Sequence, residues 1–273
     1  MKDILALCAR AVPDHGTRYA AALAQSLDGS LSALAVCEPV TDLMAAAQPA
    51  AAGLLVAWHQ DRLRHAHDTG ARFPAWAEGV GCARAQWLVA QAPVADAVAH
   101  AAAWHDLLVL PADAGLTFGT AGTIGRLLLS AGLPAIVVPE GHAAAPALDV
   151  IAVAWNGSTQ ATRALHAALP LLRRARRVVL LAGTRRTSFD RMIEAPAFDP
   201  AAHFAAHGVH HESCMMDHPD ERSGEELLAR ATAMGAGLLV MGAWGRTRAS
   251  ELLLGGATRH VLADATLPVF LRH

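Results

Sequence analysis

Residues 238–270 read LLVMGAWGRTRASELLLGGATRHVLADATLPVF, and this stretch decides the fold. The apolar run at 238–241 predicts a buried strand that stops at Gly242. Gly245 follows three residues later, and the pair Gly255–Gly256 precedes a helical pattern at 259–263. Because a second apolar run follows Pro268, the order is strand, glycine loop, helix, strand. This order is half of a doubly wound α/β unit.

The glycines of this stretch predict an anion site built mainly from backbone. Glycine has no Cβ, so the amide N–H groups of such a loop can close around a phosphate. A helix that begins after Gly255–Gly256 would direct unpaired N–H donors and the positive end of its dipole into the loop. The competing interpretation is a turn that packs tightly against the sheet, because glycine spacing alone is a weak signal.

Short apolar runs alternate with helical patterns through the first half of the chain, which implies a parallel sheet with helices on both faces. We expect strands over residues 3–8, 31–37, 83–89, 106–110 and 134–138. Helical spacing occupies residues 17–27, 94–104 and 121–130. The alanine-rich segment 44–70 suits one or two helices, with four side chains directed towards the core: Leu54, Leu55, Trp58 and Leu63.

The same pattern restarts after a linker at 139–146 that is rich in proline, glycine and alanine. The run 149–154 echoes 3–8, and 237–241 echoes 106–110, so we predict a divergent tandem repeat. The predicted domains are residues 1–140 and 147–273, each a five-stranded parallel sheet flanked by helices. The first domain lacks the glycine loop, and we interpret it as a degenerate structural partner.

Composition excludes several classes of protein. The formal net charge of −2 argues against general nucleic-acid binding. Lys2 is the only lysine, so the lysine of a P-loop is missing. The four cysteines form no C-x-x-C pair, which is typical of a reducing cytoplasm. Because no apolar run approaches the ~18 residues that a membrane helix needs, we expect a cytoplasmic protein that makes no membrane contact.

The spacing G-x2-G-x9-G of Gly242, Gly245 and Gly255 resembles the nucleotide loop of the universal stress protein family, in its tandem-domain form. The run Ala154–Ser158, which reads AWNGS, is similar to the family's first-strand signature. The resemblance implies two Rossmann-like domains of the adenine nucleotide α-hydrolase type, with strand order 3-2-1-4-5 and pairing through the last strands. It also implies a loop that cradles the phosphates of ATP, with Mg²⁺. Two positions depart from the family: Gly256 replaces the usual Ser or Thr, and Asn156 replaces the usual acidic residue.

The candidate nucleotide-binding residues come from predicted strand ends and from the loop, which meet at the carboxyl rim of the second sheet. Arg246 is a candidate to neutralise phosphate, and Trp244 either covers the ligand or shields the turn. Topology alone suggests Ala182 and Met216 as an apolar slot for adenine. The full set is Ala154, Trp155, Asn156, Ala182, Met216, Gly242, Trp244, Gly245, Arg246, Gly255, Gly256, Ala257 and Thr258.

Catalytic and metal-binding interpretations find less support in the sequence. No G-x-S-x-G elbow is present. His210, His211, Cys214 and His218 suggest a metal, but neighbours on a strand point to opposite faces, and no known ligand motif accompanies them. The leading hypothesis is a non-enzymatic, nucleotide-dependent sensor or regulator with an unidentified protein partner. The alternatives are a ligand-free dimerisation or scaffold protein and an enzyme of the wider nucleotide-hydrolase superfamily. The two domains would form a pseudo-dimer within one chain, and a homodimer is left open.

Overall fold

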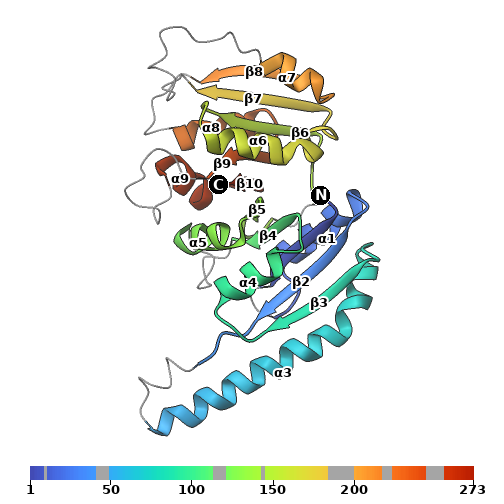
Figure 1. Ribbon diagram of the computed structural model, residues 1–273, viewed down its shortest axis with the longest axis vertical. Coiled ribbons are helices and arrows are strands. Elements are labelled where there is room, and N and C mark those ends of the chain that lie inside the picture. The colour runs from blue at the N-terminus through green and yellow to red at the C-terminus, as the bar shows by residue number, and fades with distance from the viewer. Residues whose placement is uncertain are drawn as a thin grey trace.

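The structure is a computed structural model that describes residues 1–8, 11–40, 49–112, 121–142, 145–183, 200–216, 223–243 and 255–273. Within these residues the chain forms ten strands and eight helices (Figure 1). The strands are β1 (Asp3–Cys8), β2 (Ser30–Val36), β3 (Ala85–Ala90), β4 (Leu107–Pro111), β5 (Ala135–Val138), β6 (Val150–Trp155), β7 (Arg177–Gly183), β8 (His211–Met216), β9 (Leu238–Gly242) and β10 (Val269–Arg272). The helices are α1 (His15–Ser26), α3 (Pro49–Gly79), α4 (Val94–Ala102), α5 (Ala121–Ala131), α6 (Thr159–Leu172), α7 (Pro200–Ala206), α8 (Ser223–Ala233) and α9 (Gly256–Asp264).

All ten strands belong to one sheet, in the order β3-β2-β1-β4-β5-β10-β9-β6-β7-β8. Within each half the neighbouring strands are parallel. The halves join where β5 and β10 run antiparallel, with Phe270 opposite Ile136. The strand order 3-2-1-4-5 therefore occurs twice, and the predicted pairing through the last strands is confirmed.

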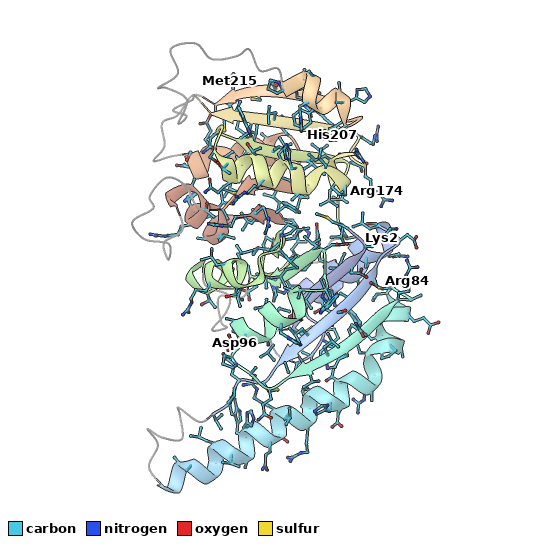
Figure 2. All side chains as sticks on the ribbon, in the orientation of Figure 1. Lys2, Arg84, Asp96, Arg174, His207 and Met215 are labelled. Atoms are coloured by element: carbon cyan, nitrogen blue, oxygen red, sulfur yellow. The ribbon has the colours of Figure 1, made fainter. Side chains whose placement is uncertain are left out.

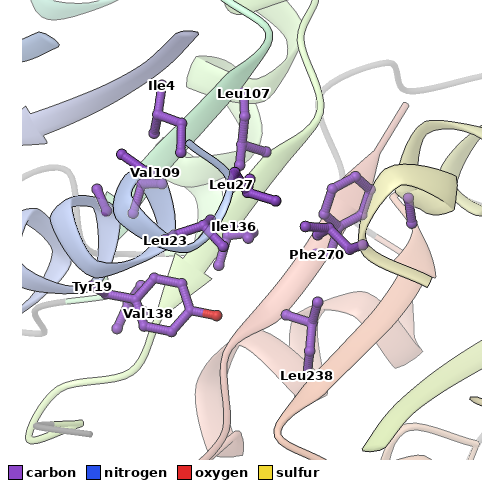
Figure 3. Close-up of a cluster of buried hydrophobic side chains, with 14 of the residues drawn as sticks. Ile4, Tyr19, Leu23, Leu27, Leu107, Val109, Ile136, Val138, Leu238 and Phe270 are labelled. Atoms are coloured by element: carbon purple, nitrogen blue, oxygen red, sulfur yellow. The ribbon is translucent and has the colours of Figure 1, made fainter. Parts of the chain in front are cut away.

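Two hydrophobic cores lie on opposite faces of this sheet because successive strand residues point to opposite sides. On β1, Ile4 and Ala6 enter a core covered by α1, α6, α7 and the end of α3, whereas Leu5 and Leu7 enter a core covered by α4, α5, α8 and α9. Both cores contain residues of both halves. Figure 3 shows this continuity, with Ile136 of the first half next to Phe270 of the second.

Arginines of the second half reach helix ends of the first half. Arg174 donates a hydrogen bond to the Ser26 carbonyl at the end of α1 (Figure 2), and Arg272 donates one to the Gly132 carbonyl just after α5. A cation at a helix C-terminus opposes the negative end of the dipole. The arginine-rich run after α6 thus contributes to the contact between the halves.

Side-chain caps fix the starts of the first helix in each half. The Thr17 amide donates to Asp14 Oδ1 at 2.8 Å, and the Asp14 amide donates back to Thr17 Oγ1 at 3.4 Å, which is a capping box. In the second half Ser158 is the N-cap of α6, and its side chain accepts a hydrogen bond from the Ala161 amide. Asn, Ser and Asp are favoured at such positions because their oxygens satisfy amides of the first turn.

The expected orientation of the α3 side chains is wrong for two residues. The described part of the segment belongs to α3, which continues through Pro74 to Gly79, and the C-terminal part of this helix buries Phe73 and Ala77. Its first turns extend past the sheet (Figure 1), and there Leu54 is 73% exposed and Trp58 is 50% exposed. The physical reason is length, because the helix is longer than the sheet surface that could cover it.

Candidate functional site

The carboxyl ends of β6 and β9 lie side by side in the second half. The two strands pair in parallel, with Val153 opposite Val240. The chain order reverses here, because β7 and β8 continue on the other side of β6. Ligands of doubly wound sheets bind at such switch points. The structure thus brings Ala154–Asn156 next to Gly242, as the sequence predicts.

The residues that follow β6 form a tight turn that starts α6. The Ser158 amide donates to Asn156 Oδ1 at 3.1 Å, and the Ala161 amide donates to Ser158 Oγ at 3.2 Å. Gly157 has a φ of +76°, a left-handed conformation that glycine adopts without steric cost. Asn156 is exposed, but its oxygen already accepts a hydrogen bond within the turn.

Gly242 allows α6 to approach the end of β9. A Cβ at this position would lie 2.6 Å from the Ala161 amide nitrogen. In the first half α1 approaches the end of β4 in the same way, but there the glycine lies on the helix. A Cβ at Gly16 of α1 would lie 3.1 Å from the nitrogen of Pro111 at the end of β4. The close packing of α6 on the end of β9 therefore explains the glycine at position 242, whether or not a ligand binds.

The loop that follows is described only at its two ends. The Ala243 amide donates to the Arg272 carbonyl at 2.9 Å, so this first amide is used within the fold. Trp244, Gly245 and Arg246 lie outside the described residues, and their expected contacts stay predictions.

At the far end of the loop, α9 begins at Gly256 without a side-chain cap. Gly255 is the N-cap and contributes no side-chain hydrogen bond. A Cβ at the exposed Gly256 would meet nothing within 4 Å, so this position is open. Ala257 is half-buried, and Thr258 is 4% exposed, which turns its hydroxyl away from solvent. The first turn of α9 thus offers backbone amides and the positive end of its dipole.

Ala182 and Met216 do not form one slot. Ala182 pairs with Trp155, which packs on the core beneath α6, whereas the 4%-exposed Met216 belongs to the opposite core. Met216 instead shares its face of the sheet with Ala154 and Met241. A shift of one residue along a strand changes the face, and the sequence pattern does not fix strand ends to one residue.

The sequence model of the universal stress protein family matches residues 148–272. This part of the chain is a universal stress protein domain. It contains β6 to β10 and all the candidate site residues described above. No curated protein sequence matches the chain.

Solved structures share the fold of the universal stress protein domain and of the half that precedes it. A universal stress protein from Archaeoglobus fulgidus DSM 4304 superposes with a TM-score of 0.71 at 14% identity, over 99% of this chain and 95% of that chain. A functionally unknown protein from Pseudomonas aeruginosa PAO1 gives a TM-score of 0.56 at 13% identity, over 100% and 92%. The cytoplasmic domain of a prokaryotic cation chloride cotransporter gives 0.52 at 11%, over 99% and 94%. These likenesses confirm the predicted fold class of two tandem α/β units, but a fold alone does not set a function.

Two arginines add positive charge beside the rim of the universal stress protein domain. Arg272 pairs with Gly242 across β10 and β9, and Arg163 lies in α6. Burial lowers the pKa of the Arg272 guanidinium below its usual value, and the like charge of Arg163 lowers it further. Sequence reasoning missed Arg272 because it lies in the last strand, away from the glycine loop. The predicted strand order 3-2-1-4-5 places this strand beside the one that ends at Gly242, and that neighbourhood could have pointed to Arg272.

Other features of the universal stress protein domain lie away from this rim. In the described part of the chain, no three His, Cys, Asp or Glu residues are arranged to hold a metal ion. A hollow of about 340 Å³ lies between α7 and the start of β8, which is the opposite end of the strands. No described helix combines the length and apolarity needed to span a membrane.

Proposed function

We propose that the universal stress protein domain binds ATP or a related adenine nucleotide at the rim formed by β6, β9 and α9. The observation that carries this proposal is the uncapped, open start of α9 at Gly255–Gly256, on the loop that leaves the β6–β9 switch point. Helix N-termini favour phosphate because unpaired amides and the dipole both act on an anion. Arg272 and Arg163 add positive charge nearby.

The described residues fit the phosphates better than they fit a metal ion. Asn156 stands where a carboxylate would help to hold Mg²⁺, and its oxygen already accepts the Ser158 amide. Mg²⁺ usually keeps several waters and takes phosphate oxygens as ligands when few carboxylates are available. We therefore expect Mg²⁺, where present, to arrive with ATP rather than to occupy a protein site of its own.

The proposed role is that of a sensor or regulator rather than an enzyme. The described rim consists of Ala154–Ser158, Met241–Ala243 and Gly255–Thr258, and none of these residues carries a carboxylate or an imidazole. A general base for hydrolysis is therefore missing from the described rim. Nucleotide binding would act by changing the affinity for a protein partner in the cytoplasm.

The test compares Gly256→Asp with Gly122→Asp by calorimetric titration with MgATP, ADP and AMP. An aspartate in the first turn of α9 stabilises the helix through its dipole but repels phosphate, so loss of binding would not reflect unfolding. Gly122 lies in the first turn of α5, and a Cβ there also meets nothing within 4 Å. We expect Gly256→Asp to weaken binding at least tenfold and Gly122→Asp to leave it unchanged.

A ligand-free scaffold is the second candidate, and two observations favour it. Asn156 Oδ1 and the Ala243 amide both form hydrogen bonds within the fold. Wild-type protein that binds no adenine nucleotide at millimolar concentration would support the scaffold and contradict the nucleotide site. Equal weakening by both aspartate variants would place any bound nucleotide elsewhere.

A further inference from the structure

Helix α7 is attached to the rest of the molecule through few side chains. It has seven residues and lies beside β8 at the outer end of the sheet (Figure 1). Phe204 is the one buried residue of this helix, and its ring stacks on that of His211 with 4.4 Å between the centroids. The four alanines of α7 are exposed. Because a helix of this length is not stable alone, its position depends on the contacts of Phe204 and of its histidines.

Three imidazole rings join α7 to α6. The centroid of the His203 ring lies 5.0 Å from that of His166 in α6 and 4.7 Å from that of His207. The planes of the His166 and His203 rings differ by 24°, so these two rings stack. Arg173 adds a permanent positive charge, because its Nε donates to the His207 carbonyl at 3.0 Å. The contact thus consists of rings that can each gain a positive charge, next to a group that always carries one.

The geometry of this contact fits uncharged rings. Nε2 of His203 is buried and has no hydrogen-bond partner among the described residues. Both nitrogens of a charged histidine carry a proton, so the charged form would leave the Nε2–H of His203 buried without an acceptor, which is costly. Nη2 of Arg173 lies 3.5 Å from Nδ1 of His207. Because a guanidinium can only donate, this hydrogen bond forms only while Nδ1 of His207 carries no proton.

The described titratable groups around His203 offer it no negative charge. Those that face the contact from α6, α7 and β8 are positive when charged: His166, Arg173, His207 and His211. The carboxylate of Glu212 in β8 binds Arg177 at 2.8 Å. Burial lowers the pKa of His203 below its usual value, and the neighbouring histidines lower it further. Charging His203 is therefore unfavourable as long as α7 stays on α6.

We propose that α7 is a pH-sensitive switch, in which protonation of His203 detaches α7 from α6 while the sheet stays folded. Detachment exposes the ring of Phe204 and gives the charged imidazole access to water. His203 takes up a proton more readily in the detached state, where its pKa returns towards the usual value of about 6.5. The attached state is therefore favoured above about pH 6.5 and loses population as the pH falls below it. One histidine shifts this equilibrium by at most about tenfold per pH unit.

Hydrogen exchange at single amides of the full chain tests the switch. The amides of residues 207–209 donate to the carbonyls of His203, Ala205 and Phe204, so their protection reports on α7. We expect this protection to fall roughly five- to tenfold between pH 7.5 and 5.5 in wild-type protein, which is what one histidine can supply. Its dependence on urea should be weaker than that of the buried Leu180 in β7, because local opening exposes less surface than unfolding. An equal dependence on urea would overturn the proposal, since α7 would then detach only when the whole fold opens.

A matched pair of variants assigns the effect to His203. His203→Phe keeps an aromatic ring in the stack but cannot take up a proton, so its protection should be the same at both pH values. His100→Phe is the control, because His100 is an exposed histidine in α4 of the first half, and it should keep the wild-type pH dependence. Constant protection in wild-type protein, or an equal loss in His203→Phe, would overturn the proposal.

NMR titration of the His203 ring in wild-type protein adds a measurement that does not depend on how a variant packs. We expect the midpoint of this titration to lie below about pH 6.5, the usual value for histidine. A midpoint at or above that value would show that the attached helix accepts the charge, and it would overturn the switch.

Discussion

Gly242 and Gly256 come from one sequence motif, yet their surroundings differ. A Cβ at Gly242 would overlap the backbone of α6, whereas one at Gly256 would meet nothing within 4 Å. Glycine is therefore required by packing at the first position and not at the second. The same motif thus combines a structural glycine with one that is open to a ligand.

Gly242→Ala should destabilise the protein by about 1–3 kcal/mol, the usual cost of forcing extra atoms into a packed site. The added methyl would lie 2.6 Å from the Ala161 nitrogen, so α6 must move. Urea unfolding measures the change, with Gly122→Ala as the control because its Cβ has open space. Equal stability of the two variants would show that α6 shifts at little cost.

Gly256→Ser restores the hydroxyl that is usual at this position in the universal stress protein family. The open space at Gly256 accepts the side chain without movement of the neighbours. A hydrogen bond to a charged group such as phosphate contributes about 1.5 kcal/mol or more, so we expect affinity for ATP to rise roughly tenfold. Calorimetric titration measures it, and Gly122→Ser should have no effect. Unchanged affinity would place the phosphates away from the first turn of α9.

Strands and helices could be predicted from the sequence where apolar residues recur at a clear spacing. The tandem repeat helped, because the same order of elements occurs in both halves of the chain. The orientation of Leu54 and Trp58 could not be predicted, because periodicity identifies an apolar face without identifying what covers it. The adenine slot failed for another reason, since Ala182 and Met216 lie on opposite faces. The β6–β9 rim was predictable because strand order follows from the chain order of parallel units. The centre of the loop, with Trp244 and Gly245, lies outside the described residues.

A histidine cluster that sequence reasoning did not single out lies where α7 packs on α6. The His203 ring centroid lies 5.0 Å from that of His166 in α6 and 4.7 Å from that of His207. Burial lowers the pKa of His203, and the neighbouring His166 and His207 lower it further. Arg173 adds a positive group, because its Nε donates to the His207 carbonyl at 3.0 Å. Protonation of His203 therefore opposes the packing of α7 on α6.

The depressed pKa of His203 makes stability depend on pH. Because the folded-state pKa of His203 is depressed, the unfolded chain binds protons more readily, and stability falls as the pH drops below about 6.5. His142, whose pKa burial also lowers, acts in the same direction. We expect His203→Phe to lose less stability than wild type between pH 7.5 and 5.5 in urea unfolding. Equal losses would assign the dependence to other groups.

Across the whole molecule, the two halves share one sheet and both cores. β5 and β10 pair directly, and Arg174 and Arg272 bind carbonyls at helix ends of the first half. Such an extensive contact differs from the mobile interface expected between independent domains. The first half therefore completes the fold of the second, whatever its own capacity to bind a ligand.

This continuity predicts that the chain unfolds as one cooperative unit. Phe270 is fully buried at the junction and lies opposite Ile136. Phe270→Ala should lower the free energy of unfolding by about 3–5 kcal/mol, as large-to-small core substitutions do. Native-state hydrogen exchange can report on β1 and β6 separately, and we expect the slowest amides of both strands to lose protection equally. Trp104→Ala, at an exposed site, should change neither strand. If β1 kept its wild-type protection in Phe270→Ala, the first half would hold its fold without the second, and the shared sheet would be a contact between two independent units.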